Sequence, residues 1–172
     1  SLDHVGPLTR SVADAAIMLQ AISGLDGHDV TCLPVPAPNM LEGMDSGVKG
    51  VRIGFDEQYA TKNIDTEVTE AVIAAVKVME GLGAEIVAVQ LPDMDEYVTA
   101  WPILCSAEAV AAHEVTYPSQ KDDYGPWFRG WLDMGAKVTG AAYAKANNLR
   151  AACSGHLLRV FEEIDVLACP SM

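Results

Sequence analysis

The stretch from residue 51 to residue 91 constrains the fold of this chain most. "VRIGF" is a short apolar strand candidate at its start, and "EIVAVQL" is a second candidate that ends before Pro92. Between them, apolar residues recur at helical spacing in a segment that Asp65 can cap and Gly83 can end. A strand, a helix and a strand of these lengths form a right-handed crossover with parallel strands. We therefore predict a βαβ unit over 51–91.

The residues before this unit predict one helix and a long connection. Ser11 is placed as a capping residue, an apolar stripe follows it at helical spacing, and Gly24 can stop the helix. The segment 25–50 then holds three prolines and four glycines, which disfavour both helix and strand. A loop of this length is usually functional or supported by another part of the molecule.

The residues after the unit predict further helices and a last strand. The pattern favours a helix over 94–116 with an interruption at Pro102, and one long helix over 137–163. "DVLACPS" predicts a buried strand near the end of the chain. The predicted fold class is α/β, with parallel strands in the 51–91 unit, and residues 1–172 form a single α/β domain or a piece of a larger one.

Composition excludes several classes of partner. Half of the 172 residues are apolar and a fifth are charged, which is enough apolar surface for a packed core. The net charge of −13 disfavours binding to nucleic acid, whose phosphates it would repel. No apolar run reaches the length of a membrane span. We therefore expect no membrane partner. The four cysteines are widely spread, as in reduced cytoplasmic proteins, so we expect the protein to be cytoplasmic.

Local motifs indicate neither a metal site nor a cofactor. "VKGVRIGF" lacks the G-x-G-x-x-G of dinucleotide binding, and the chain holds no G-x-S-x-G nucleophile turn. "HEVTY" at His113 begins like a zinc-protease helix, but Tyr117 stands where the second His would be needed. By its residues alone, the chain is an α/β domain without an identifiable active centre.

Longer stretches resemble a known family. "SLDHVGPLTRSVADAAIMLQAISGLDGHD" resembles the segment of the amidase signature family that follows its catalytic signature. "GVKGVRIGF" resembles that family's next strand, and "AEAVAAHE" its substrate-side helix. "MGAKVTGAAYAKANNLRAA" and "FEEIDVLACPSM" are similar to its closing helix and strand. The resemblance covers nearly all of the chain in the family's order.

The resemblance implies hydrolysis of a small-molecule amide by a Ser–cis-Ser–Lys triad on a mixed and mainly parallel sheet flanked by helices, without a cofactor. A neutral Lys deprotonates the bridging Ser, which activates the nucleophile, while backbone N–H groups hold the oxyanion. An acyl-enzyme forms, the amine leaves, and water completes the turnover.

In the family, all three triad residues lie upstream of the segment that matches Ser1. No catalytic residue is therefore assigned to this chain, which we expect to be the C-terminal portion of an amidase core, truncated at both ends. Its expected partner is the missing N-terminal half of its own domain, and it should be inactive alone. Without that half, part of the sheet's edge and faces should lie bare.

The turn near the family's site is matched by Asp3, Gly6, Pro7 and Arg10. We favour a structural role for them over direct contact with substrate. Gly6 would permit an unusual φ, Pro7 would fix the next one, and Arg10 would pair with Asp14 at i,i+4.

Aromatic residues match the part of the family that shapes the acyl pocket, where they are either core residues or pocket walls. The glutamine-dependent amidotransferase branch carries an Arg shortly before the glycine that matches Gly135, and that Arg grips a substrate carboxylate. Trp131 stands at that offset here, and a tryptophan cannot form a bidentate clamp. The resemblance thus favours an amidase for uncharged acyl groups, aromatic ones among them. The candidate pocket residues are Trp101, Trp127, Phe128 and Trp131.

Two other functions stay open at this stage. The chain could belong to the glutamine-hydrolysing subunit of a tRNA-dependent amidotransferase, or it could be a non-catalytic binding or scaffold module. The sequence also leaves open whether the protein forms a homodimer.

Overall fold

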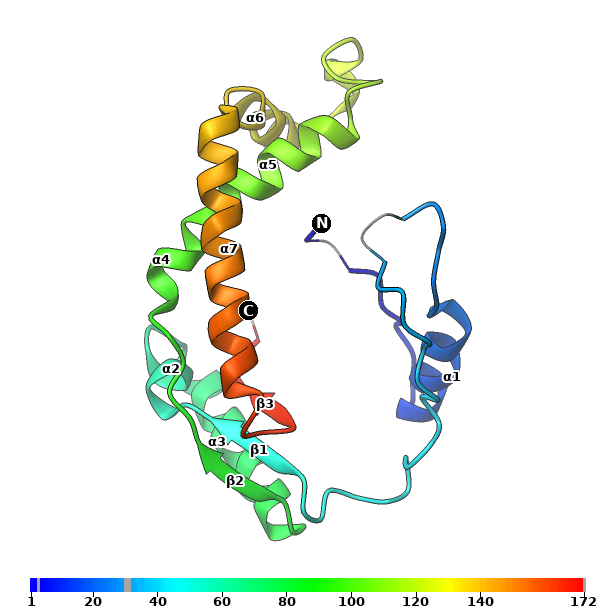
Figure 1. The fold of residues 1–172 in the computed structure, drawn as a ribbon, viewed down its shortest axis with the longest axis vertical. Helices are drawn as coiled ribbons and strands as arrows, with labels where there is room; N and C mark the ends of the chain where they lie inside the picture. Colours follow the sequence, from blue (N-terminus) through cyan, green and yellow to red (C-terminus); the bar gives the residue numbers. More distant parts are fainter. Residues whose placement is uncertain (3, 30–31, 172) are drawn as a thin grey trace. The chain divides into compact units, whose positions relative to one another are not determined.

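The chain divides into two compact units, Ser1–Lys49 and Gly50–Met172, in a computed structural model that describes residues 1–2, 4–29 and 32–171 (Figure 1). Asp3, one of the residues assigned to the turn near the site, lies outside the described residues.

The first unit contains the helix α1, Val12–Ile22, as predicted. The Ser11 hydroxyl accepts a hydrogen bond from the backbone N–H of Asp14 at 3.1 Å, which caps the helix start. The described residues of 25–49 form neither helix nor strand, also as predicted. The backbone N–H of Met40 donates to the Gln20 side chain at 2.7 Å and so ties this loop to α1.

The second unit is built on a parallel three-stranded sheet in the order β2-β1-β3. The strands are β1 Arg52–Phe55, β2 Glu85–Ala88 and β3 Val166–Ala168. The predicted βαβ unit is confirmed, because β1 and β2 pair in parallel across the helix α3, Thr66–Gly81. The register places Ile53 opposite Ile86 and Val166, Gly54 opposite Val87 and Leu167, and Phe55 opposite Ala88 and Ala168.

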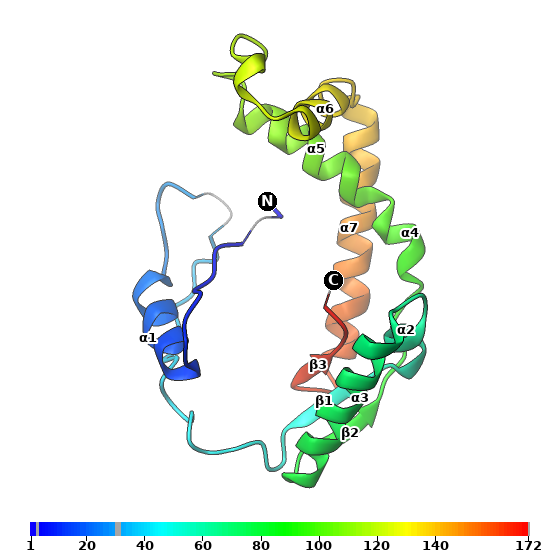
Figure 2. The same ribbon diagram turned by 180° about the vertical axis from the view of Figure 1, so that it is seen from behind.

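The helix α3 covers one face of this sheet. It contacts β2 and lies in front of the sheet in Figure 2. The helix α7, Gly140–Val160, runs toward β3 in Figure 1. Asp65 caps α3 through the backbone N–H of Glu67 at 3.0 Å, and Gly83 follows the helix with φ of 97°. Only glycine adopts such a φ readily, so both predicted ends of α3 are confirmed.

The sequence pattern missed the short helix α2, Glu57–Thr61, between β1 and α3, and it also assigned no helix to 121–123 or 126–135, which are helical in the structure. The five residues of α2 are too few to show a helical stripe, so periodicity could not detect it. Asp56 begins α2 by accepting the backbone N–H of Tyr59 at 3.0 Å.

The interruption predicted at Pro102 lies three residues earlier. The structure has α4 at Met94–Val98 and α5 at Ala100–Ala112, with the break at Thr99. Pro102 therefore stands in the first turn of α5, where a backbone N–H has no helical partner to lose. A proline is tolerated there, so the position of the break is displaced from the proline itself.

Three helices pack together at the far end of this unit. The helix α6, Pro126–Gly135, follows the short 3-10 helix η1, Lys121–Asp123, and contacts α5, which also contacts α7. Leu104, Leu132 and Ala146, one from each helix, are almost fully buried in this layer. They form a second core beside the one around the sheet.

The last strand is less buried than predicted. Val166 of β3 is 45% exposed, because β3 pairs with β1 on one side and no strand among the described residues covers its other edge. In the parts of the chain that the structure describes, no helix is long and apolar enough to cross a membrane.

Candidate functional site

Three of the four predicted pocket aromatics form one cluster on α5 and α6. The ring of Trp131 lies 5.4 Å from that of Trp101 and 5.8 Å from that of Trp127, and the latter pair is stacked at 7°. Trp127 and Trp131 stack because residues four apart share one face of a helix. Trp127 is 77% exposed and Trp101 is 53% exposed, so this tryptophan cluster forms a surface of the unit.

The fourth residue, Phe128, faces a different set of side chains. Its ring lies 5.3 Å from that of His113 and 5.9 Å from that of Tyr124. The Nδ1 atom of His113 is 3.0 Å from the Tyr124 hydroxyl, which also bonds with the Thr116 hydroxyl. The structure therefore separates Phe128 from the three tryptophans.

Sequence reasoning missed this polar set around Tyr124. The turn-rich segment between Thr116 and Tyr124, which includes η1, brings His113 and Tyr124 together, and no regular spacing links these two residues. The same segment brings the Tyr117 hydroxyl to the Asp133 carboxylate, to which it donates a hydrogen bond. That bond raises the pKa of Tyr117, because it holds the phenolic proton against a negative charge.

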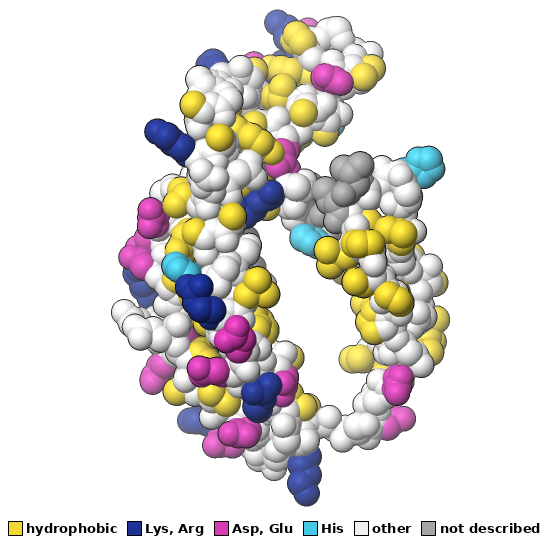
Figure 3. All heavy atoms as spheres, in the orientation of Figure 1, with side chains coloured by type: hydrophobic (Ala, Val, Ile, Leu, Met, Phe, Trp, Pro, Cys, Tyr) yellow, Lys and Arg dark blue, Asp and Glu magenta, His cyan; other side chains and the backbone are white. Residues whose placement is uncertain are grey.

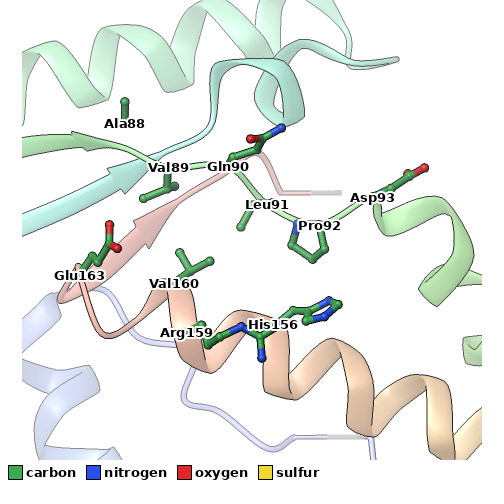
Figure 4. Close-up of a pocket in the computed structure, with 10 residues that line it drawn as sticks. All are labelled: Ala88, Val89, Gln90, Leu91, Pro92, Asp93, His156, Arg159, Val160 and Glu163. Carbon is green, nitrogen blue, oxygen red and sulfur yellow. The ribbon is translucent and has the colours of Figure 1, made fainter.

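Two hollows flank the segment 90–93, which follows β2. The first, of about 600 Å³, lies between residues 88–93 and the end of α7 (Figure 4). The second, of about 540 Å³, lies where all three strands end, with Asp56 and Pro170 in its lining. Ligands of parallel sheets often bind beyond the carboxyl ends of the strands, so this edge is a candidate site.

The wall between the hollows is held by a buried carboxylate. Asp56 is 8% exposed, and its second oxygen accepts the backbone N–H of Leu91 at 2.7 Å. Beside the second hollow, Lys62 pairs with Asp95 at 2.8 Å, and this contact raises the pKa of Lys62. Sequence reasoning did not find these hollows, because residues far apart in the chain line them.

The first hollow has an unusual set of polar side chains. His156 bonds through Nδ1 to the Tyr97 hydroxyl at 2.7 Å. Arg159 and Glu163 also line the hollow, and neither has a side-chain hydrogen bond or ion pair with any described residue. Two opposite charges are thus available at one hollow.

Neither the described residues of the predicted turn near the site nor the cysteine Cys153 forms a catalytic group. Gly6, for which an unusual φ was expected, is not among the glycines with positive φ. Arg10 and Asp14 form no ion pair, because α1 begins at Val12 and Arg10 lies before it. Burial raises the pKa of the Cys153 thiol, which disfavours the reactive thiolate. Within the described ranges, no three His, Cys, Asp or Glu side chains are placed to hold a metal ion.

The comparison with protein families matches the Amidase family model over residues 1–172. Among curated relatives, an amidase of Pseudomonas putida is 36% identical over 172 residues, which are all of this chain and 37% of the relative. A glutamyl-tRNA(Gln) amidotransferase subunit of Geobacter sp. (strain M21) is 32% identical over 99% of this chain and 40% of its own. The chain spans about two fifths of the length of these relatives.

Solved structures agree with this match. A bacterial aryl acylamidase of the amidase signature enzymes has a TM-score of 0.78 at 25% identity, over 96% of this chain and 37% of its own. A glutamyl-tRNA(Gln) amidotransferase subunit of Thermotoga maritima has a TM-score of 0.72 at 26% identity. The match covers 96% of this chain and 38% of the Thermotoga chain. Sequence and fold together place the chain in the amidase family, among the amidase signature enzymes.

Proposed function

We propose that the chain is part of an amidase that hydrolyses the C–N bond of linear amides through an acyl-serine intermediate. The match of the Amidase family model to all 172 residues carries this proposal. The 36% identity to the Pseudomonas putida amidase supports hydrolysis as the activity.

In the proposed reaction, a serine oxygen adds to the amide carbonyl carbon, and the C–N bond breaks as the leaving nitrogen takes up a proton. Water then adds to the acyl-serine ester and releases the carboxylic acid. The serine and its Ser–Lys partners are supplied by a part of the amidase domain that residues 1–172 do not match. The chain alone is therefore inactive.

That other part of the domain is the proposed partner. The described surface is large for the mass, since the chain exposes 12433 Å². Two separate compact units with the masses of residues 1–49 and 50–172 would expose only about 9,600 Å². The excess supports a further body of protein packed against this chain.

The chemistry of the exposed surface supports the same partner. None of the residues of α1 is buried, and hydrophobic side chains gather over this helix and its loop (Figure 3). Leu8 is 99% exposed and Val12 is 79% exposed, although large apolar side chains prefer burial. The free edge of β3 offers unpaired backbone groups to another strand.

The tryptophan cluster suggests the substrate class. Trp131 stands where the resemblance implies a carboxylate-binding Arg in the amidotransferase branch, and it stacks with Trp127. An apolar aromatic wall favours uncharged and aromatic acyl groups over glutamine. The similarity to an aryl acylamidase is consistent with this preference.

A second candidate is the glutamine-hydrolysing subunit of a tRNA-dependent amidotransferase. It is favoured by the 32% identity to the Geobacter protein over 99% of the chain. Trp131 argues against it, because an indole is uncharged and cannot form the bidentate clamp that an arginine forms with a carboxylate.

Both candidates are tested with a chimera in which the unmatched part of the Pseudomonas putida amidase is joined to residues 1–172. We expect the chimera to hydrolyse an aryl amide with a higher kcat/KM than glutamine. A preference for glutamine would instead support the amidotransferase function. The same assay on residues 1–172 alone should show no turnover, and a fluorophosphonate should not label this chain. Labelling would reveal a nucleophile within the chain and contradict the proposed division of labour.

A further inference from the structure

The hollow between residues 88–93 and the end of α7 combines one guanidinium and one carboxylate with no partners. Arg159 and Glu163 both line it, and Figure 4 shows them on different sides of Val160. Oppositely charged residues four apart on a helix often form an ion pair. Because α7 ends at Val160, Glu163 lies outside the helix, and this pair does not form with Arg159. By contrast, Arg52 and Lys62 of this unit are each paired with an aspartate. The carboxylate of Asp93, the third charged residue of the hollow, lies 4.0 Å from the Lys62 ammonium group, whereas Arg159 and Glu163 are solvent-exposed and available to a ligand.

A second donor stands beside Arg159. His156 lies three residues earlier on α7, which places the two side chains on one face of the helix. When the Tyr97 hydroxyl donates to Nδ1, the imidazole carries its proton on Nε2. His156 then offers an N–H donor next to the guanidinium, and such a pair suits a carboxylate.

The charges around the hollow select against simple ions. A plain anion near Arg159 would also meet Glu163, Asp93 and the negative end of the α7 dipole. A plain cation near Glu163 would meet Arg159. A molecule with both charges satisfies both ends, because its ammonium group gains from Glu163 and from the last carbonyls of α7.

The size and the apolar lining limit the ligand further. About 600 Å³ of space suits a small molecule. Val160 lies beside Arg159 in the lining, and Val89, Leu91 and Pro92 form part of the opposite wall (Figure 4). These side chains favour a short aliphatic body.

From this arrangement we propose that the hollow binds a small amino carboxylate, with its carboxylate on Arg159 and His156 and its ammonium group on Glu163. This binding site is separate from the proposed hydrolysis, since none of its residues belongs to the tryptophan cluster.

Isothermal titration calorimetry tests the ligand class. The protein used is the chain alone or the chimera, chosen because its near-UV circular dichroism spectrum shows a packed core. The probes are L-norvaline, 5-aminopentanoate, pentanoate and pentylamine. At least one of the two zwitterions should bind about tenfold more tightly than pentanoate and pentylamine, since each of those two probes lacks one of the proposed hydrogen bonds to a charged group. If neither zwitterion binds more tightly than the single-charge probes, the proposal is wrong.

Matched variants test the two contacts. Arg159→Gln and Glu163→Gln should each weaken zwitterion binding about tenfold. Lys145→Gln on α7 and Glu162→Gln beside Glu163 make the same charge changes outside the hollow, and they should leave the affinity unchanged. Equal losses in the controls would mean a general charge effect and would overturn the proposal.

The outcome is distinguishable from that of the hydrolysis assay. Arg159→Gln should leave kcat/KM of the chimera for an aryl amide unchanged. An inactive chimera that binds the zwitterion would therefore refute only the proposed function, and an active chimera without binding would refute only this site.

Discussion

Gly135 of α6 lies against the backbone of Ser106 of α5 so closely that a Cβ atom on residue 135 would come within 2.0 Å of the Ser106 carbonyl oxygen. Ser106 is fully buried, and Gly135 is buried as well. The contact brings α6, with Trp127 and Trp131, against α5, with Trp101. One glycine therefore sets the spacing on which the tryptophan cluster depends.

Replacement of this glycine should separate the two helices. Gly135→Ala is expected to lower the free energy of unfolding by about 2–3 kcal/mol, because the clash is with backbone and no rotamer can relieve it. Urea denaturation followed by tryptophan fluorescence measures this loss. Gly130→Ala on the same helix is the control, since a Cβ there meets nothing within 4 Å. The control should be neutral or more stable by about 0.5–1 kcal/mol, as expected for Gly to Ala in an open helical position. Equal behaviour of the two variants would contradict the close contact.

Loss of the Asp56 carboxylate should release both α2 and the wall between the hollows. Asp56→Ala is expected to cost about 2 kcal/mol of unfolding free energy, from one helix cap and one hydrogen bond to the Leu91 N–H. Asp65→Ala, which removes only the exposed cap of α3, should cost about 1 kcal/mol. Amide hydrogen exchange should also show faster exchange at Leu91 in Asp56→Ala alone. Unchanged exchange at that amide would count against the bond.

The pair between Arg52 and Asp165 should make stability depend on pH in the acid range. Asp165 accepts Arg52 Nη2 at 2.7 Å and the Arg52 backbone N–H at 2.9 Å, and these bonds lower its pKa below the ordinary 3.8. A lowered pKa in the folded state gives a contribution that is present above pH 3.8 and is lost as the pH falls through the folded value. The wild type should be more stable than Asp165→Asn at pH 7, and the difference should shrink as the pH falls below 3.8 and through the lowered pKa of Asp165.

The size of that difference should be small, because both side chains are partly exposed, and it should fall further at high salt. Thermal unfolding of both proteins between pH 7 and pH 2 gives the measurement. A difference that persists unchanged at the acid end would show that the asparagine acts through packing and not through charge.

Shortening Trp127 should affect substrate binding more than stability. In the chimera, Trp127→Ala is expected to raise KM for an aryl amide roughly fivefold with kcat unchanged, as aromatic stacking contributes about 0.5–1.5 kcal/mol. The unfolding free energy should change by less than about 0.5 kcal/mol, because the side chain is 77% exposed. Trp127→Phe should restore most of the affinity. Leu158→Ala, also at an exposed apolar position, should leave KM unchanged. An unaltered KM in Trp127→Ala would remove the tryptophan cluster from the proposed acyl pocket.

Local sequence patterns predicted the elements whose stabilising contacts are short in range. The start of α1 at Ser11 and both ends of α3 follow from hydrogen bonds within a few residues. The parallel pairing of β1 and β2 follows from the length of the connection between them. Boundaries were less accurate, as with α7, which is shorter at both ends than the predicted 137–163.

Side-chain groupings were predicted less well. The resemblance to the family selected four aromatic residues as one pocket set, but it could not show that Phe128 turns toward His113 and away from the tryptophans. Adjacent residues on a helix differ by about 100° in direction, and only the packed neighbours determine what each one meets. The charged pair at the hollow was missed for a similar reason, because its apolar lining comes from residues 88–93, more than sixty positions earlier.

By itself, then, the sequence determined the family, the α/β class, the parallel unit over 51–91 and the capped ends of its helices, because each depends on residue order and local hydrogen bonds. The tertiary structure alone decided that Gly135 lies on Ser106, that Asp56 holds Leu91, and that Arg159 and Glu163 share a hollow. Those contacts join segments far apart in the chain, and their geometry depends on how whole helices pack against the sheet and against one another.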